Sequence, residues 1–282
     1  MFGGALKFLI ADPALKLWWS ASSWIGPRHL TNLVQQQEAY GDTVFYFDSD
    51  AVNGCVALTI DDGLARHGAE GSMVGAVASL LRKHSAHATF FVCSKYLDGL
   101  ESEAQSLVAE GHELGNHMVE DVNFLYPKMA AEEFEAALTG VTAAIERAAP
   151  GHRVRWFRAP QGLLTATMAE AVRRNGLRHA LGDAYADDWA LEDANFVAST
   201  ILRQATHGSV IILHQPEVGY REHTLTTLRL VLEGLSERGM RAVTLSELDA
   251  IASAGGKEQE RGGGVGGGVT PGGGGGGQPE LL

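Results

Sequence analysis

Two patterns of apolar and polar residues alternate through the middle of the chain. One consists of short runs rich in β-branched and aromatic residues, bounded by glycine or polar residues, as in buried strands. These runs lie at 55–60, 87–93, 153–159, 209–214 and 241–245, with weaker ones at 112–116 and 177–182. In the other pattern, apolar residues recur at helical spacing, as in amphipathic helices. These segments lie at 71–84, 101–110, 129–148, 165–175, 193–206 and 223–238.

Strand and helix patterns therefore alternate, which predicts an α/β fold with a parallel sheet. About seven strands suit either a barrel or an open, doubly wound sheet. Several predicted helices end at a glycine just before a strand, where glycine favours the left-handed residue that closes a helix. These glycines are Gly111, Gly176, Gly208 and Gly239. No phosphate-binding glycine loop follows the first strand, so nucleotide binding is not favoured.

Composition divides the chain into three regions. Residues 1–50 read as an irregular N-terminal extension, with Trp18, Trp19 and Trp24 close together and a strand-like VFYF at 44–47. Residues 51–252 contain the alternating pattern and predict one large domain. Residues 253–282 are glycine-rich and have little to bury, so we expect a disordered tail.

The net charge and the apolar runs exclude some classes of partner. The chain of 282 residues has a formal net charge of -12, which repels phosphate backbones and argues against nucleic acid as a partner. No apolar stretch reaches the ~20 residues that span a bilayer, so no transmembrane segment is expected. Asp12 and Pro13 interrupt the apolar start, which makes it a poor secretory signal and favours an intracellular protein. The sequence gives no indication of the oligomeric state.

The two cysteines are Cys55 and Cys93, and both stand in apolar runs. Cysteine in such surroundings usually packs as a small hydrophobic residue. Two cysteines exclude a disulfide framework but leave a single bridge open.

Side chains suited to metal binding and acid–base chemistry follow several predicted strands. The carboxyl ends of parallel barrel strands converge on one face, where such barrels place their sites. The residues are Asp61, Asp62, His117, Asp121, Arg158, Gln161, Asp183, Asp187, Asp188, Trp189 and His214. Loop residues are commonly polar without a function, but this set consists mainly of metal ligands and acid–base groups. The pattern therefore favours an active site over a solvated rim.

Asp61 and Asp62 are adjacent at a strand exit. Successive side chains of a strand point in opposite directions, so one carboxylate can bind a metal while the other moves a proton. The alternative for an Asp-Asp-Gly sequence is a tight turn with a capping aspartate.

Six short motifs occur in an order that resembles one family. They are ALTIDDG (57–63), HATFFV (87–92), GHELGNH (111–117), FRAPQG (157–162), ADDW (186–189) and IILH (211–214). From about residue 55 to 250 the chain resembles the NodB-homology polysaccharide deacetylases, carbohydrate esterase family 4. The resemblance implies a distorted (β/α)7 TIM-like barrel in residues 51–252. It also implies a metal-dependent hydrolase that removes acetyl groups from an N-acetylated or O-acetylated carbohydrate.

The resemblance also implies a role for each site residue. Asp61 would be the general base, held by Arg158, and His214 the general acid, paired with Asp188. Asp183 and Asp187 remain alternatives for the acid beside His214. The backbone N–H of Gln161 would stabilise the oxyanion, and Trp189 would form a wall of the substrate pocket. The metal ligands would be Asp62, His117 and Asp121.

Asp121 departs from the family pattern, in which the third ligand is normally histidine. The resemblance implies Zn²⁺, whereas a second carboxylate makes the site harder and also admits Mn²⁺, Fe²⁺ or Co²⁺. Because His117 and Asp121 stand four residues apart, we expect one helical turn to place both on the same side. Leu64, Ala159 and Gln161 also replace usual family residues.

Two alternative functions remain open. The altered site could serve a small non-sugar linear or cyclic amide. The protein could also be a catalytically weakened carbohydrate-binding protein of the same fold. Asp61, Arg158 and His214 are all present, which favours an enzyme.

Overall fold

The computed structural model describes residues 12–22, 27–48 and 50–262. Within these residues, seven parallel strands form one curled sheet, and each coincides with a predicted apolar run. The strands are β1 (Cys55–Gly63), β2 (Thr89–Val92), β3 (Glu113–Asn116), β4 (Trp156–Phe157), β5 (Arg178–His179), β6 (Val210–His214) and β7 (Arg241–Val243).

Strand β1 lies at the centre of the sheet, whose order is β5-β4-β3-β2-β1-β6. All nine residues of β1 are buried, as expected for a parallel strand covered on both faces. β6 pairs with its second half, from Ala57 to Asp61, while β7 pairs with its start, from Cys55 to Ala57. The end of β1 therefore lies beside the end of β6, with Asp61 opposite His214.

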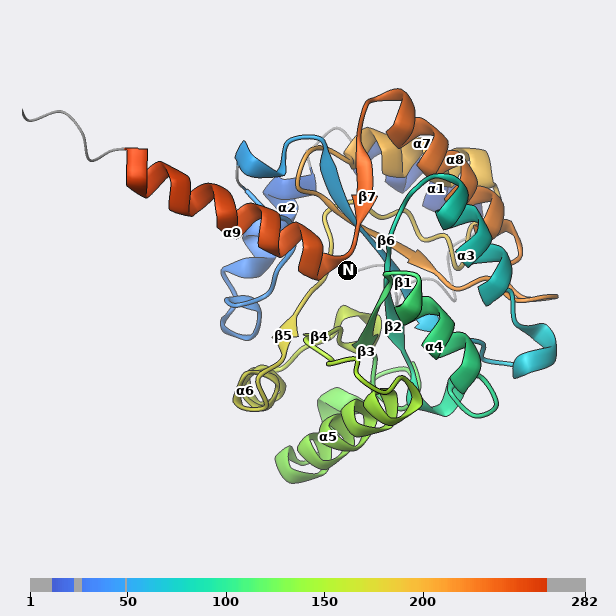
Figure 1. Ribbon diagram of the computed structural model, residues 1–282, viewed down its shortest axis with the longest axis vertical. Coiled ribbons are helices and arrows are strands. Elements are labelled where there is room, and N and C mark those ends of the chain that lie inside the picture. Colours follow the sequence, from blue (N-terminus) through green and yellow to red (C-terminus); the bar gives the residue numbers. More distant parts are fainter. Residues whose placement is uncertain (1–11, 23–26, 49, 263–282) are drawn as a thin grey trace, which may run out of the picture.

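The sheet curls until the chain after β5 approaches β6. Ala184 forms an isolated parallel bridge with Ile211, and the Ile212 N–H donates to the Ala184 carbonyl over 3.0 Å. This contact closes the sheet with one short bridge in place of a full strand pair. The predicted α/β fold with a distorted (β/α)7 barrel is confirmed (Figure 1).

The six helices predicted between the strands are all present and pack around the sheet (Figure 1). They are α3 (Val74–Lys83), α4 (Glu101–Ala109), α5 (Ala131–Ala148), α6 (Ala166–Arg174), α7 (Ala194–Gln204) and α8 (His223–Glu237). The apolar face of α8 buries Leu228, Val231, Leu232 and Leu235, which follow helical spacing. The Asp193 side chain caps α7 by accepting from the Phe196 N–H over 3.0 Å.

The N-terminal region contains regular structure where we expected an irregular extension. Helices α1 (Asp12–Ser22) and α2 (Pro27–Gln35) precede residues 43–47, which pack against the barrel. Val44 pairs in parallel with Ala180, and Tyr46 pairs with Ser209. The segment therefore fills the seam between β5 and β6, because it bonds to the chain on both sides of that seam. Trp24 lies outside the described residues.

The C-terminal helix α9 (Leu245–Gly262) extends beyond the boundary expected at residue 252 (Figure 1). A reciprocal capping box begins it: the Thr244 N–H donates to Glu247 over 2.8 Å, and the Glu247 N–H donates to the Thr244 hydroxyl over 3.1 Å. Residues 263–282 of the expected disordered tail lie outside the described residues. Among the described helices, none combines the length and apolar character needed to cross a membrane.

Gly208 is required where the N-terminal segment meets β6. Its φ is +78°, and a Cβ built there would overlap the Phe47 carbonyl oxygen. The Phe47 N–H also donates to the Gly208 carbonyl over 2.8 Å, so the two backbones cannot separate freely.

We therefore expect Gly208→Ala to lower the free energy of unfolding by about 2–5 kcal/mol, combining left-handed strain with overpacking. Gly176→Ala is the matched control, since Gly176 has a φ of +72° but no atom within 4 Å of its Cβ position. Urea denaturation of both variants measures the difference. Equal losses would contradict a close approach at Gly208.

Candidate active site

Five neighbouring elements bring the predicted site residues to the carboxyl end of the barrel. Asp61 and Asp62 lie just before Gly63, the last residue of β1, and His214 is the last residue of β6. His117 follows β3 directly, and Arg158 follows β4. The loop after β5 provides Asp188. The convergence of parallel strand ends accounts for this gathering of residues far apart in sequence.

Asp62, His117 and Asp121 form a cluster in which one potential ligand atom of each lies within 4.8 Å of the others. His117 Nε2 is 3.9 Å from Asp62 Oδ1. His117 Nδ1 is 2.9 Å from the Arg158 carbonyl oxygen, which fixes the ring with Nδ1–H donating and leaves the Nε2 lone pair toward Asp62. An orienting hydrogen bond of this kind is typical of a metal-binding histidine.

The loop 117–121 is not the helical turn that we expected. Met118 has a φ of 64°, and its N–H donates to the Asn116 side chain over 2.8 Å. The Met118 carbonyl accepts from the Ser94 N–H over 3.0 Å. The prediction of a helical turn was wrong because these bonds hold a left-handed residue immediately after His117. The structure nevertheless brings Asp121 near His117 by this different route.

Two arginines that sequence analysis missed contact Asp62. Arg221 Nη1 lies 2.7 Å from Asp62 Oδ2, and Arg66 Nη2 lies 3.3 Å from the same oxygen. Burial raises the pKa of Asp62, but Arg221, His214, His117 and Arg66 outweigh burial and hold that pKa well below its ordinary value. Arg66 stands four residues after Asp62, and this spacing could have suggested the contact. Arg221 is 159 residues away from Asp62, so no local pattern in the sequence indicates that contact.

Asp121 is in a different electrostatic position. Burial and then the negative charge of Asp62 raise the pKa of Asp121, despite lowering contributions from His117 and His214. Two carboxylates that repel each other beside a histidine with a free nitrogen suit a divalent cation. The three residues therefore fit the metal that was predicted, and their chemistry leaves the identity of the ion open.

Asp61 and Arg158 form a buried ion pair. Arg158 Nη1 lies 2.5 Å from Asp61 Oδ1, and Arg158 is only 1% exposed. The guanidinium also donates to the Thr59 hydroxyl and to the carbonyls of Ala180 and Leu181, over 2.8, 3.0 and 3.2 Å. These bonds satisfy a charge that would otherwise be costly to bury.

His214 and Asp188 form a second buried pair. His214 Nδ1 is 2.7 Å from Asp188 Oδ1, and the His214 N–H donates to Asp188 Oδ2 over 2.7 Å. Burial lowers the pKa of His214, but Asp188 outweighs this and raises it overall. The two alternative acids lie elsewhere: Asp183 binds Arg28, and Asp187 binds Trp19 and Tyr185.

Gln161 and Trp189 lie in the chain that follows β4 and β5, respectively. Gln161 has a φ of 58°, and its side chain donates to Asp121 over 3.2 Å and to Asn123 over 2.7 Å. Trp189 is half-buried, and its indole N–H donates to the Tyr185 hydroxyl over 3.0 Å. Gln161 thus supports the loop that carries Asp121, a contact that sequence analysis did not predict.

Comparison with known proteins identifies the family. Residues 48–180 match the family model described as polysaccharide deacetylase. A chitooligosaccharide deacetylase from Azorhizobium caulinodans is 31% identical over 194 residues, which cover 65% of this chain and 89% of that protein. The chain belongs to the polysaccharide deacetylase family.

Two further proteins are similar to most of the chain at lower sequence identity. A peptidoglycan-N-acetylglucosamine deacetylase from Bacillus cereus is 27% identical over 196 residues, covering 68% of this chain and 87% of that protein. The structure of a peptidoglycan deacetylase from Bacillus subtilis has a TM-score of 0.65 at 24% identity, covering 75% of this chain and 98% of that one. This structure supports the fold alone.

The fold also occurs without activity. A pseudoenzyme of the same family from Bacillus anthracis has a TM-score of 0.63 at 20% identity, covering 73% of this chain and 68% of that one. Catalysis in this family therefore depends on the residues of the site and not on the fold alone.

Backbone strain in this deacetylase-family protein is concentrated around the site. The described residues include seven non-glycine residues with positive φ, and five of them border the groups above. These five are Asp62, Met118, Gln161, Asp187 and Arg221. Each such residue costs about 1–3 kcal/mol, which the surrounding contacts must offset, and such strain is typical of functional sites.

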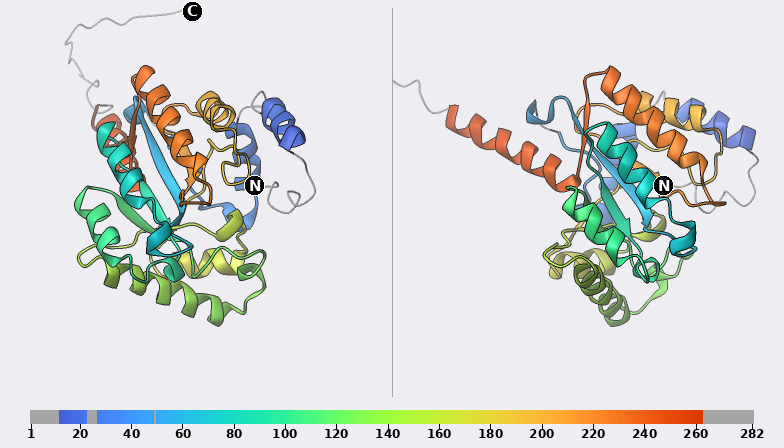
Figure 2. Two further views of the ribbon diagram at one scale, coloured as in Figure 1. Left: turned by 90° about the vertical axis from the view of Figure 1, so that its right-hand side faces the viewer. Right: turned by 45° about the vertical axis from the view of Figure 1, so that its right-hand side comes forward.

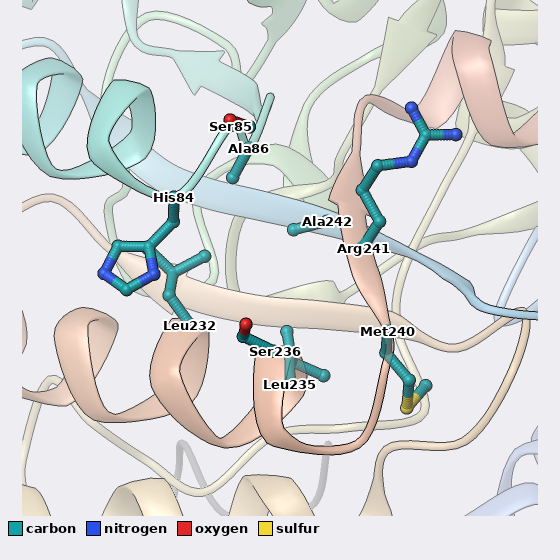
Figure 3. Close-up of a pocket in the computed structure, with 9 residues that line it drawn as sticks. All are labelled: His84, Ser85, Ala86, Leu232, Leu235, Ser236, Met240, Arg241 and Ala242. Atoms are coloured by element: carbon teal, nitrogen blue, oxygen red, sulfur yellow. The ribbon is translucent and has the colours of Figure 1, made fainter.

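A cavity lies at the other end of the barrel (Figure 3). It has a volume of about 130 Å³ and lies between α8, the start of β7 and the turn after α3. Leu232 and Leu235 line it with Ser236, and none of the predicted site residues does. β7 pairs with the start of β1, whereas Asp61 and Asp62 stand at the end of β1.

The His214–Asp188 pair predicts a pH-dependent stability. The pKa of His214 is raised above its ordinary 6.5, so its contribution is complete below about 6.5 and is lost as pH rises through the raised value. The pKa of Asp188 is lowered from 3.8: burial raises it, but His214 outweighs burial. Its contribution is complete above about 3.8 and is lost as pH falls through the lowered value.

Asp188→Asn should therefore destabilise the protein most between about pH 4 and 6.5, by about 3–5 kcal/mol, and less at pH 9. Asp249→Asn, at the exposed ion pair with Arg178, is the control. Urea denaturation at pH 5.5 and pH 9 measures both variants. An equal loss at the two pH values would contradict a change in the charge of His214 between pH 5.5 and pH 9.

Proposed function

We propose that this protein is a metal-dependent hydrolase that removes acetyl groups from an N-acetylated or O-acetylated carbohydrate, and that residues 51–252 form the deacetylase domain. One observation carries the proposal: the Asp62, His117 and Asp121 cluster lies beside both buried pairs at the end of β1. The names of two relatives, which refer to chitooligosaccharide and to peptidoglycan N-acetylglucosamine, support an acetylated sugar as the substrate.

Asp62, His117 and Asp121 would hold the divalent ion. When bound, it would supply electrophilic polarisation of the acetyl carbonyl and acidification of water. Zn²⁺ is the expected ion by family, and the two carboxylates also suit Mn²⁺, Fe²⁺ or Co²⁺.

Asp61 would act as the general base. Arg158 binds Asp61 Oδ1, which keeps the carboxylate oriented and leaves Oδ2 to accept a proton from water. The water oxygen then bonds to the acetyl carbon. The backbone N–H of Gln161 would donate to the carbonyl oxygen as negative charge develops there.

His214 would act as the general acid. Asp188 binds Nδ1, so that Nε2 carries the proton toward the leaving group. That proton passes to the sugar nitrogen, or to oxygen in an ester, as the bond to the acetyl carbon breaks. Trp189 would form a wall of the sugar pocket. The products are acetate and the free amine or hydroxyl.

A carbohydrate-binding protein without catalysis is the second candidate, because a solved structure of this fold is a pseudoenzyme. Here, however, the base, its arginine, the acid and its carboxylate are all present and in contact as pairs. Enzymatic deacetylation therefore accounts for the geometry better than binding alone.

Deacetylation should depend on Asp61. Asp61→Asn should lower acetate release from an N-acetylated chito-oligosaccharide by about 10²–10⁴-fold, because the general base is removed. Metal-loaded protein is used, and acetate is measured by an enzyme-coupled assay. Asp42→Asn, at an exposed position, is the control. If wild type releases nothing from N-acetylated sugars, O-acetylated sugars or small amides, the protein is not this hydrolase.

Metal binding should depend on Asp121. Asp121→Ala should lose bound metal, whereas Asp121→His should bind with a stronger preference for zinc. Mass spectrometry of metal content and calorimetric titration with Zn²⁺ and Mn²⁺ measure both effects. Glu120→Ala removes the neighbouring carboxylate, which binds Lys95, and serves as the control. Unchanged metal content in Asp121→Ala would exclude Asp121 as a ligand.

A further inference from the structure

We propose that the described N-terminal residues, 12–22 and 27–47, hold the active-site loops in place, and that Trp19 is a positioning residue for the turn carrying Asp187 and Asp188. This inference rests on the proposed function, since Asp188 is the partner of the proposed acid. All of these N-terminal residues precede residue 48, where the match to the family model begins.

Three contacts from the segment reach a single stretch of chain, from the end of β5 to the turn at Asp187. Val44 bonds to both sides of Ala180: its N–H donates to the His179 carbonyl over 2.9 Å, and its carbonyl accepts from the Leu181 N–H over 2.8 Å. Further along, Arg28 Nε lies 3.1 Å from Asp183 Oδ2. Trp19 then reaches Asp187.

The contact of Trp19 with Asp187 is specific. The indole N–H donates to Asp187 Oδ2 over 3.0 Å, and the Tyr185 hydroxyl donates to Asp187 Oδ1. The rings of Trp19 and Tyr185 pack edge to face with centroids 5.5 Å apart. Both carboxylate oxygens of Asp187 therefore have donors, one of them from α1.

The backbone at Asp187 explains why this contact matters for the site. Asp187 is 2% exposed and has a φ of 54°, and its carbonyl accepts from the N–H groups of Ala190 and Leu191 over 2.9 and 3.0 Å. In this turn the side chain of Asp187 points toward Trp19 in α1, and the side chain of the next residue, Asp188, points toward His214. Holding Asp187 thus fixes the direction of Asp188.

The same N-terminal segment holds a second site loop. The Tyr40 hydroxyl donates to the Gly162 carbonyl over 2.9 Å and accepts from the Leu164 N–H over 3.0 Å. These two bonds clamp the turn that contains Gln161. Figure 2 shows α1 beside α7, on the side of the barrel where the chain after β5 runs.

The adjacent tryptophans of α1 provide a matched pair of variants. Trp18 is 61% exposed, whereas Trp19 is half-buried against Tyr185. Trp19→Phe keeps an aromatic ring and removes the indole N–H. Trp18→Phe makes the same chemical change at a position away from Asp187.

The first test needs no turnover. Hydrogen exchange of the Ala190 and Leu191 amides should accelerate about tenfold or more in Trp19→Phe and remain at the wild-type rate in Trp18→Phe. Equal exchange in the two variants would overturn the positioning role, whether or not the protein proves to be a deacetylase.

The second test uses the metal-loaded, full-length protein with the N-acetylated substrate. Trp19→Phe should lower kcat about tenfold per bound metal and leave KM within about twofold, because Asp188 orients the proposed acid, whereas Trp189 keeps its own bond to Tyr185. In an Asp187→Asn background, Trp19→Phe should add no further loss. If Trp19→Phe lowers kcat by a further tenfold in the Asp187→Asn background, or raises KM alone, the inference is overturned. If the wild type is inactive but Trp19→Phe still accelerates exchange of the Ala190 and Leu191 amides, only the proposed function is overturned.

Discussion

The buried guanidinium of Arg158 connects more of the site than any other side chain described above. Its donors reach Asp61 and Thr59 in β1 and two carbonyls at the exit of β5. Its own backbone carbonyl binds His117 Nδ1. One residue thus orients both the proposed base and a proposed metal ligand. Because an unpaired buried charge is costly, this network tolerates little displacement, and the strand ends it joins must stay in register.

Around this network, each acidic group has a distinct electrostatic environment. Asp188 is matched by His214, and Asp62 by Arg221 and Arg66. Asp121 differs, since burial and Asp62 together raise its pKa. A cation placed among Asp62, His117 and Asp121 would relieve that repulsion. The distribution of charges therefore supports separate roles for carboxylates that lie within one small region.

Periodicity predicted the strands and the six helices of the barrel, since burial on a sheet or helix leaves a local pattern. The order of polar residues at strand ends predicted which side chains would gather. The backbone at 117–121 was not predictable, because the left-handed Met118 depends on Asn116 and on the distant Ser94. Contacts of Asp62 with Arg221, and of Asp187 with Trp19, join residues 159 and 168 positions apart and leave no local signal. The start of α9 could have been recognised from the capping box of Thr244 and Glu247, but a capping box gives no signal for where a helix ends.

The seam between β5 and β6 has a consequence for how the chain folds. Residues 43–47 must pair with Ala180 and Ser209, although both partners follow by more than a hundred residues. During synthesis these residues emerge before either partner, and their pairing is incomplete until β6 has been made. Contacts of such long sequence separation close slowly. The buried Phe45 and Phe47 would remain exposed through most of synthesis, which makes this segment the point at which early aggregation or chaperone binding would begin.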